Sequence, residues 1–295
     1  LAGLARKKED AGPTRLRLTQ AECRAVRGEP LWTLGTVRLY EPKPGPDVIA
    51  YLFKSSDKTG EAIGIVENSV GAGRLVVYAY DPALCITRLR QGHPERAIFL
   101  PAGQQRPRAT FLQEPNPPGD AFWRPTADLH ALVLCQVIKR LLGRNAPVPV
   151  LWHIPEGRPS ILLFSGDEDG SAQEANQQQM SDLESFGGAM NLYVIPDSTS
   201  ITRPLIEEYT RRGHAISIHP DLTPTAGQSP DKQLAAAENQ FRLFQQKFDW
   251  PVRTVRNHCY MWPSYLDIPE LWEKLGIVMD ANTTATLYGL SADDG

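Results

Sequence analysis

From about residue 149 onward, segments with a strand pattern alternate with segments with a helix pattern. This alternation restricts the fold more than any other feature of the sequence. The strand patterns are short apolar runs, and the helix patterns repeat apolar residues every three or four positions. Such alternation predicts an α/β fold, with a parallel sheet whose strands are joined by helical crossovers. The expected strands are 161–164, 190–195, 214–219, 252–255 and 277–279, and the expected helices are 172–186, 202–213, 229–248 and 268–275.

Acidic and basic side chains follow these expected strands. The first strand, 161–164, consists of four apolar residues, so we expect it to be buried on both faces. The carboxyl ends of parallel strands meet at one edge of a sheet, where functional groups gather. The charged residues at these ends therefore form a candidate metal or acid–base site. They are Asp167, Glu168, Asp169, His219, Arg256, His258 and Asp280.

Composition narrows the classes of function. The 295 residues suggest two domains, and a hydrophobic content of 41% suffices for buried cores. A formal net charge of −3 argues against a nucleic-acid-binding surface. No apolar run reaches the ~18 residues of a membrane span. The four cysteines are far apart and form no C-x-x-C pair, so they indicate neither a disulfide framework nor a thiolate metal cage.

The first half of the chain has a different pattern. We expect 1–30 to be a truncated or disordered lead-in, because it is charged and weakly patterned. Strand-like segments follow, with a hairpin around the loop 68–73, and Thr126 begins an amphipathic helix. The expected domains are 31–144 and 150–295, joined by the proline-rich segment 145–150.

The order of elements over 48–143 resembles the back half of a class I glutamine-amidotransferase-like domain. A strand is followed by a hairpin that ends in Gly-Ala-Gly-Arg-Leu-Val-Val-Tyr-Ala-Tyr-Asp, then by a long connection and a helix. Neither Cys85 nor Cys135 lies in the Gly-x-Cys-x-Gly setting that a catalytic thiol of such a domain needs. The resemblance therefore implies a smaller α/β accessory domain without catalytic residues.

Three motifs in the second half resemble those of the polysaccharide deacetylases, carbohydrate esterase family four. The segment 165–170, Ser-Gly-Asp-Glu-Asp-Gly, resembles the family's Thr-Phe-Asp-Asp-Gly. The segment 213–219, Gly-His-Ala-Ile-Ser-Ile-His, resembles its Gly-His-Glu-Ile-Gly-Asn-His, and Arg256 in Val-Arg-Asn-His resembles the arginine that begins its third motif. The resemblance covers 158–280. It implies a distorted (β/α) barrel that removes acetyl groups from an N-acetylated polysaccharide outside the cytoplasm.

The same resemblance implies a role for each matched residue. The family binds one divalent metal ion, usually zinc, and activates water for attack on the acetamide carbonyl. Asp167 corresponds to the catalytic base, and Arg256 is the cation that holds this base ionised. His219 corresponds to a metal ligand. The extra acid in the first motif leaves two candidates, Asp169 and Glu168, for the carboxylate ligand.

This chain also departs from the family pattern. Thr223 stands where the family has a second metal-binding histidine, four residues after His219. We hypothesise that His258 replaces it, so that Asp169, His219 and His258 form the open three-ligand set of a catalytic zinc site. The family's later motif, with its catalytic-acid histidine, would fall beyond Gly295.

Aromatic residues and two further histidines have more than one interpretation. Tyr260, Trp262 and Tyr265 follow Arg256 closely, and either form a platform on which a sugar ring stacks or belong to the core. Trp262 and Tyr260 are the candidates for substrate binding. His130 and His214 are expected to be structural, because neither occupies a ligand position.

Three functions remain open on the sequence. The first is a metal-dependent hydrolase that deacetylates an N-acetylated glycan. The second is a binding module of the same fold that grips a glycan without chemistry, which Thr223 favours. The third is a metal-dependent phosphoesterase, which is weaker because Arg256 is the only basic group that we find near the acids to hold a phosphate.

Overall fold

The computed structural model describes residues 5–11, 14–19, 30–41, 47–53, 62–98, 100–112, 126–143, 147 and 154–282. The chain divides into two compact units, each with its own hydrophobic core. Unit 1 comprises Leu1–Gln91 and Glu114–Leu151, and unit 2 comprises Gly92–Gln113 and Trp152–Gly295. The segment 92–113, expected in the first domain, thus belongs to the second unit. None of the described helices is both long and apolar enough to cross a membrane.

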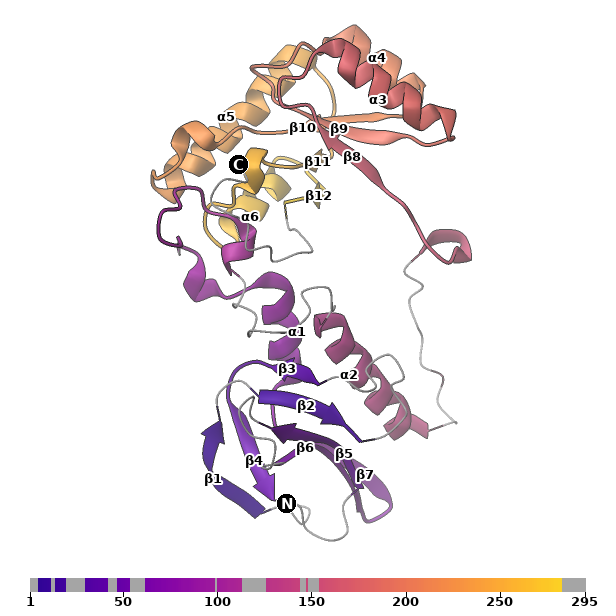
Figure 1. Ribbon diagram of the computed structural model, residues 1–295, viewed down its shortest axis with the longest axis vertical. Coiled ribbons are helices and arrows are strands. Elements are labelled where there is room, and N and C mark those ends of the chain that lie inside the picture. Colours follow the sequence, from indigo (N-terminus) through magenta and orange to yellow (C-terminus); the bar gives the residue numbers. More distant parts are fainter. Residues whose placement is uncertain are drawn as a thin grey trace. The chain divides into compact units, whose positions relative to one another are not determined.

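Unit 2 contains the expected parallel sheet (Figure 1). Five described strands run parallel in the order β12-β11-β10-β9-β8 and form a curled sheet. The strands are β8 (Phe164–Asp167), β9 (Met190–Val194), β10 (Ala215–Ile218), β11 (Thr254–Val255) and β12 (Met279–Asp280). The helices are α3 (Gln173–Ser185), α4 (Arg203–Arg211), α5 (Pro230–Phe248) and α6 (Asp267–Lys274). Short 3₁₀ turns occur at Pro94–Arg96, Ala109–Leu112, Pro155–Gly157, Thr223–Thr225 and His258–Tyr260.

The helices cover one face of this sheet, and this face carries the core of unit 2. Figure 1 shows α3, α4 and α5 on the same side of the strands. Apolar residues alternate along β9 and β10, so that Leu192, Val194, Ile216 and Ile218 are buried against the helices. The residues between them point to the opposite face, which is polar and leads to the candidate site. The core also includes Met180, Ile206, Tyr209, Phe244, Phe248, Val255, Ile268 and Trp272.

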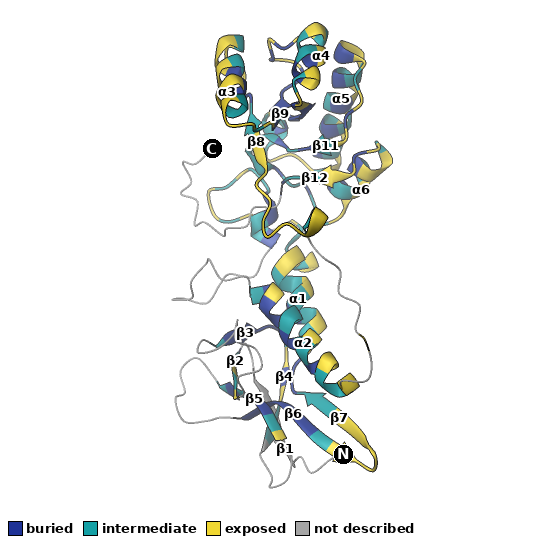
Figure 2. Cartoon of the chain, turned by 90° about the vertical axis from the view of Figure 1, so that its right-hand side faces the viewer, coloured by how far each residue is buried: buried dark blue, intermediate teal, exposed yellow. Residues whose placement is uncertain are grey.

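The expectation that 161–164 is a buried strand is wrong. β8 begins only at Phe164, and the side chains before it are open to solvent, with exposed fractions of 59% for Ile161, 76% for Leu162 and 72% for Leu163. Figure 2 shows this lead-in as exposed. Among the described strands β8 pairs only with β9, so it is an edge strand. A run of four apolar residues indicates a strand buried on both faces only where neighbouring strands lie on both sides.

Unit 1 is built around an antiparallel sheet, which contradicts the expected α/β accessory domain and its likeness to an amidotransferase. Its described strands follow the order β1-β4-β6-β5-β2-β3, with β7 paired to β6, and every pairing is antiparallel. Antiparallel strands joined by hairpins differ from the alternating α/β class, so the amidotransferase likeness has no support. The elements are β1 (Ala5–Ala11), β2 (Thr14–Leu18), β3 (Leu31–Thr33), β4 (Val37–Glu41), β5 (Asp47–Phe53), β6 (Ala62–Val70), β7 (Gly73–Tyr78), α1 (Pro82–Gln91) and α2 (Thr126–Leu142).

The segment 1–30 is also not a disordered lead-in where it is described. β1 pairs with β4, and β2 lies between β3 and β5. Within β2, Thr14 and Leu16 are buried, because their side chains point toward the core while Arg15 and Arg17 point away from it. The hairpin around 68–73 is confirmed as β6 and β7, which pair from Ile65–Tyr78 to Val70–Gly73.

The two histidines expected to be structural are confirmed as such. His130 of α2 is buried in unit 1, and its Nε2 lies 2.6 Å from the Trp32 carbonyl oxygen. Burial lowers the pKa of His130, which keeps the ring neutral. His214 is buried in unit 2, where its Nδ1 accepts the Met190 amide proton at 3.1 Å and its Nε2 lies 2.9 Å from Glu184 Oε1. Both rings satisfy buried polar groups.

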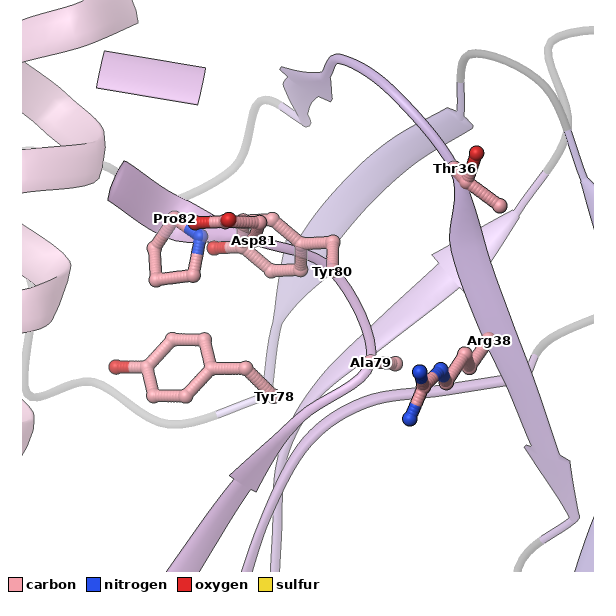
Figure 3. Close-up of a pocket in the computed structure, with 7 residues that line it drawn as sticks. All are labelled: Thr36, Arg38, Tyr78, Ala79, Tyr80, Asp81 and Pro82. Atoms are coloured by element: carbon pink, nitrogen blue, oxygen red, sulfur yellow. The ribbon is translucent and has the colours of Figure 1, made fainter. Parts of the chain in front are cut away.

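A cavity of about 510 Å³ opens in unit 1 beside the start of α1 (Figure 3). Figure 3 shows Thr36 and Arg38 on one side and Tyr78 on the other. Its lining residues are Thr36, Arg38, Tyr78, Ala79, Tyr80, Asp81 and Pro82. The Asp81 carboxylate already accepts the Leu84 amide proton at the start of α1. None of the site residues expected from the sequence lines this cavity.

A buried carboxylate joins the sheet of unit 1 to α2. The side chain of Glu67 on β6 is 8% exposed and pairs with Arg74 at 3.2 Å and with Arg140 of α2. Arg140 also contacts Asp47 of β5 at 2.6 Å. A buried charge is costly unless it keeps its partner, so this network makes the helix–sheet contact of unit 1 specific.

We expect Arg140→Met to destabilise unit 1 by about 1–3 kcal/mol, because it leaves the Glu67 carboxylate buried with one of its two arginines removed. The measurement is the free energy of unfolding in urea. Arg90→Met is the matched control, because Arg90 pairs with Asp128 where both side chains are more than half exposed, and it should cost less than about 1 kcal/mol. Equal losses in the two variants would contradict the prediction.

Candidate metal centre

Asp167 and Arg256 form an ion pair at the carboxyl ends of β8 and β11. Arg256 Nη1 donates to Asp167 Oδ1 at 2.8 Å, and Nη2 donates to Ser165 Oγ at 2.7 Å. The guanidinium also lies over the Tyr193 ring, 4.5 Å from its centroid. These contacts join Arg256, which follows β11, to β8 and β9, and they fix the direction of the Asp167 carboxylate. Its second oxygen, Oδ2, lies 4.0 Å from His219 Nε2.

Three further side chains converge beside this ion pair. His219 follows β10, His258 follows β11, and Asp169 follows β8. His219 Nε2 lies 3.1 Å from Asp169 Oδ1 and 3.4 Å from His258 Nδ1. His258 Nδ1 lies 3.3 Å from Asp169 Oδ1. The structure thus brings together the three residues that the sequence suggested as metal ligands.

The hydrogen bonds of His219 determine which nitrogen faces the cluster with a lone pair. Its Nδ1 lies 2.6 Å from the Arg256 carbonyl oxygen, which can only accept, so Nδ1 carries the proton. Burial lowers the pKa of His219 and favours the neutral ring. The unprotonated Nε2 then points at the Asp169 carboxylate. Two acceptors at 3.1 Å repel each other unless a proton or a cation lies between them.

The spacing of the three donor atoms fits a zinc ion. Tetrahedral ligands about 2.0–2.1 Å from zinc lie about 3.3 Å from one another. The observed separations are 3.1, 3.3 and 3.4 Å. Two imidazoles and one carboxylate, with a fourth position free, are the donor set of catalytic rather than structural zinc. The residues present therefore fit a divalent ion.

Glu168, the alternative carboxylate ligand, lies outside this cluster. β8 ends at Asp167, and the turn that follows, in which Asp169 has a φ of 47°, brings Asp169 into the cluster while Glu168 stays outside it. Its side chain is buried, Oε2 accepts the Gly170 amide proton at 3.3 Å, and its neighbours include Lys247. Burial raises the pKa of Glu168. Of the two acids that the sequence left open, Asp169 lies in the cluster and Glu168 does not.

Thr223 does not contribute to the cluster either. Its hydroxyl donates to Asp221 Oδ1 at 2.6 Å, and its amide donates to the same oxygen at 2.9 Å. These bonds close a turn after β10. His258 supplies the second imidazole from the next strand along. A hydrogen bond with the Cys259 sulfur raises the pKa of His258 to about 9, so a metal ion must displace a proton from this ring in order to bind it, and the same bond lowers the pKa of Cys259.

The two residues predicted to bind substrate, Tyr260 and Trp262, are both half-buried. Trp262 is half-buried against the core of unit 2, and its Nε1 donates to the Tyr265 carbonyl oxygen at 3.2 Å. The backbone of Tyr260 has a φ of 52°, in the left-handed region. Both residues lie within a few positions of His258. Their role in substrate binding remains a prediction.

Sequence reasoning missed a polar link that supports the site loop. Asn282 donates twice to Asp280 Oδ1, at 2.8 and 2.7 Å, and its own Oδ1 accepts the Asn257 amide proton at 2.6 Å. Asn257 Nδ2 in turn donates to the Met261 carbonyl oxygen at 2.7 Å. The link therefore connects the end of β12 to the loop that carries His258. The spacing of Asp280 and Asn282 is a recognisable turn signal.

Comparison with known proteins yields only partial likenesses. No protein-family model and no curated protein matches the chain. Among solved structures, peptidoglycan deacetylase PdaC from Bacillus subtilis has 16% identity over 40% of this chain and 55% of its own, with a TM-score of 0.28. A family 4 acetyl xylan esterase from Clostridium thermocellum, in complex with a cobalt ion, has 17% identity, the same coverages and a TM-score of 0.28.

A CE4 family pseudoenzyme from Bacillus anthracis also matches, with 10% identity over 40% of this chain and 41% of its own, and a TM-score of 0.27. The chain therefore spans about half the length of the solved structures that it matches. At these TM-scores the likeness does not decide the function of this chain.

Asp280 predicts a pH dependence of stability. Burial raises the pKa of Asp280 to about 6, from an ordinary 3.8, and the bonds from Asn282 oppose this shift only in part. The folded protein thus keeps a proton that the unfolded chain has already lost, so this group lowers stability as the pH rises from about 4 to 6. Asp280→Asn stays neutral, and we expect it to be more stable than the wild type by roughly 2–3 kcal/mol at pH 8 and equally stable at pH 4.

The measurement is urea unfolding of both proteins across this pH range. Asp249→Asn is the control for removing a carboxylate, because the Asp249 side chain is 99% exposed, and the pH-dependent difference should be clearly larger for Asp280→Asn than for this variant. A constant difference between Asp280→Asn and the wild type would refute the assignment.

Proposed function

We propose that unit 2 is a metal-dependent hydrolase that removes acetyl groups from an N-acetylated glycan. The observation that carries the proposal is the cluster of Asp169, His219 and His258, with donor atoms 3.1–3.4 Å apart beside the Asp167–Arg256 ion pair. The three sequence motifs that contain these residues support an acetamide as the substrate group. Zinc is the ion that the two imidazoles and the carboxylate suit best.

Each residue of the site has a separate role in the proposed reaction. A divalent ion held by the cluster supplies Lewis-acid chemistry, polarising a carbonyl group and making water a stronger acid. Asp167 is the general base, because its Oδ2 faces the cluster and accepts a proton from water there. Arg256 donates to Asp167 Oδ1 and is itself fixed by its bond to Ser165 Oγ, so that the Asp167 carboxylate does not rotate away from the cluster. His219 keeps its proton on Nδ1, which leaves Nε2 for the metal.

The charges at the site favour an acetamide over a phosphoester. Phosphoryl groups carry negative charge and are bound by arginine or lysine side chains. Arg256 is already engaged by Asp167 and Ser165, and two carboxylates line the site. A neutral acetamide meets no such repulsion. The second candidate function is a module that binds a glycan without catalysis. It is favoured by Thr223, which stands where a second histidine is expected after β10 and which bonds to Asp221 instead.

The metal centre is tested first by zinc stoichiometry. We expect about one zinc per chain in the wild type, measured by plasma mass spectrometry after dialysis, and its loss in His219→Ala and in His258→Ala, because each removes one of three ligands. Thr223→Ala is the control and should keep the metal, because Thr223 contacts Asp221 and not the cluster. Stoichiometric zinc in His258→Ala, with intact circular dichroism, would contradict the ligand set.

The chemistry is tested with Asp167→Asn. The amide keeps the shape of the side chain but cannot act as a base, so we expect acetate release from chitin oligomers and peptidoglycan fragments to fall about 10²–10⁴-fold. The zinc content should not change. Phosphate release from an aryl phosphate, without acetate release, would favour the phosphoesterase. Glycan binding by zinc-loaded wild type without either product would favour the binding module.

A further inference from the structure

The turn that carries His258 has an unusual backbone. Cys259 and Tyr260 follow it with φ values of 55° and 52°, so two consecutive residues other than glycine lie in the left-handed region. Such conformations are costly for side chains with a Cβ, and they persist where the surrounding structure holds them. The same turn directs His258 Nδ1 toward Asp169 and His219. Contacts from elsewhere in unit 2 must therefore hold the turn in place.

Those contacts come from a segment about 150 residues earlier in the chain. Arg106 Nη1 donates to Cys259 Sγ at 3.3 Å. The Trp262 amide donates to the Pro107 carbonyl oxygen at 2.7 Å, and Arg108 forms an antiparallel bridge with Met261. Met261 is fully buried, so the bridge is anchored in the core of unit 2. We call residues 104–108 the strap.

The strap is itself fixed to the scaffold at another point. The Gly227 amide donates to the Gln105 carbonyl oxygen at 3.0 Å, which ties the strap to the connection between β10 and α5. On the other side of the turn, the His258 amide donates to the Pro220 carbonyl oxygen at 2.9 Å. The turn is thus held between the strap and the residue that follows His219. Within this frame, Arg106 contacts the side chain of the strained residue Cys259 from outside the turn.

We propose that Arg106 is a positioning residue for the metal centre, acting through Cys259 to hold the strained turn that aims His258 at Asp169 and His219. The proposal rests on the function proposed above, because it requires that His258 be a metal ligand. Arg106 itself is not a ligand, because its guanidinium is always protonated and offers no lone pair to a metal ion. Groups that orient a metal-bound histidine typically change metal affinity by 10–100-fold when they are removed.

The test is a double-mutant cycle on zinc affinity, measured by competition with a chelating dye. Arg106→Ala and Cys259→Ala should each weaken zinc binding about 10–100-fold. The double variant should lose no more than the larger single loss, because Arg106 acts through the Cys259 sulfur. Arg106→Lys keeps a donor and should recover part of the affinity. Arg242→Ala, which removes an exposed arginine of α5 paired with Glu238, is the control and should bind zinc as the wild type does.

Thermal unfolding of each variant without metal separates positioning from folding. A positioning role predicts lower zinc affinity with little change in the melting temperature of the metal-free protein. Unchanged affinity in Arg106→Ala, or losses that add in the double variant, would overturn the inference while leaving the metal centre in place. Absence of zinc binding in the wild type would overturn both the inference and the proposed function.

A substitution at Cys259 gives a second route should Arg106→Ala fail to fold. Asparagine tolerates the left-handed region and offers an oxygen to the arginine, so Cys259→Asn should bind zinc more tightly than Cys259→Val. Valine is β-branched and strained at this φ, and it offers Arg106 no acceptor. Equal zinc affinity in the two variants would also overturn the proposal, because neither the strain nor the acceptor would then matter to His258.

Discussion

The hydrogen bond from His219 Nδ1 to the Arg256 carbonyl oxygen is the interaction on which the site depends. It joins the ends of β10 and β11, and it requires the parallel register that pairs Ile218 with Val255. By placing the proton on Nδ1, it leaves Nε2 as a lone pair in the middle of the cluster. The side chain of Arg256 meanwhile holds Asp167. One residue therefore orients a candidate ligand with its backbone and the candidate base with its side chain.

The neighbouring ends of parallel strands explain why these groups meet. Asp167 ends β8 and Asp169 lies in the turn after it, while Glu168 between them is buried outside the cluster. The layer below is polar as well. Ser217 Oγ donates to Asn191 Oδ1 at 2.7 Å, and Asn191 Nδ2 donates to Thr254 Oγ1 at 2.8 Å, so β9, β10 and β11 are linked directly beneath the site.

The sequence predicted the parts of unit 2 that local pattern determines. The stripe of apolar residues over 229–248 predicted α5, and strand–helix alternation predicted the parallel sheet. The sequence placed Asp169, His219 and His258 at the ends of expected strands, and in the structure these three side chains lie together. The choice between Asp169 and Glu168 could not be made, because both residues lie beyond the end of β8, in a turn whose backbone no apolar pattern predicts.

Other features depend on contacts that no local pattern contains. Ile161, Leu162 and Leu163 form an apolar run that looks like a buried strand, but they precede β8 and are exposed. β1 was missed because it carries five consecutive charged residues, and β2 because its alternation covers only five positions. Both form strands by pairing, β1 with β4 and β2 with β5. Arg106 could not have been connected with Cys259, since the two are separated by 153 positions. The periodicity of a sequence shows which side of a helix or strand is apolar, but not which other segment packs against that side.

The position of the second imidazole has a structural consequence. A histidine four residues after His219 would belong to the same connection as the first ligand, and its orientation would follow from one local turn. Here Thr223 closes that turn with Asp221, and the imidazole comes from the end of β11, on a backbone strained at Cys259 and Tyr260. Such a ligand needs support from outside its own strand. In the proposed arrangement that support comes from the strap, residues 104–108, which belong to unit 2 although unit 1 surrounds them in sequence.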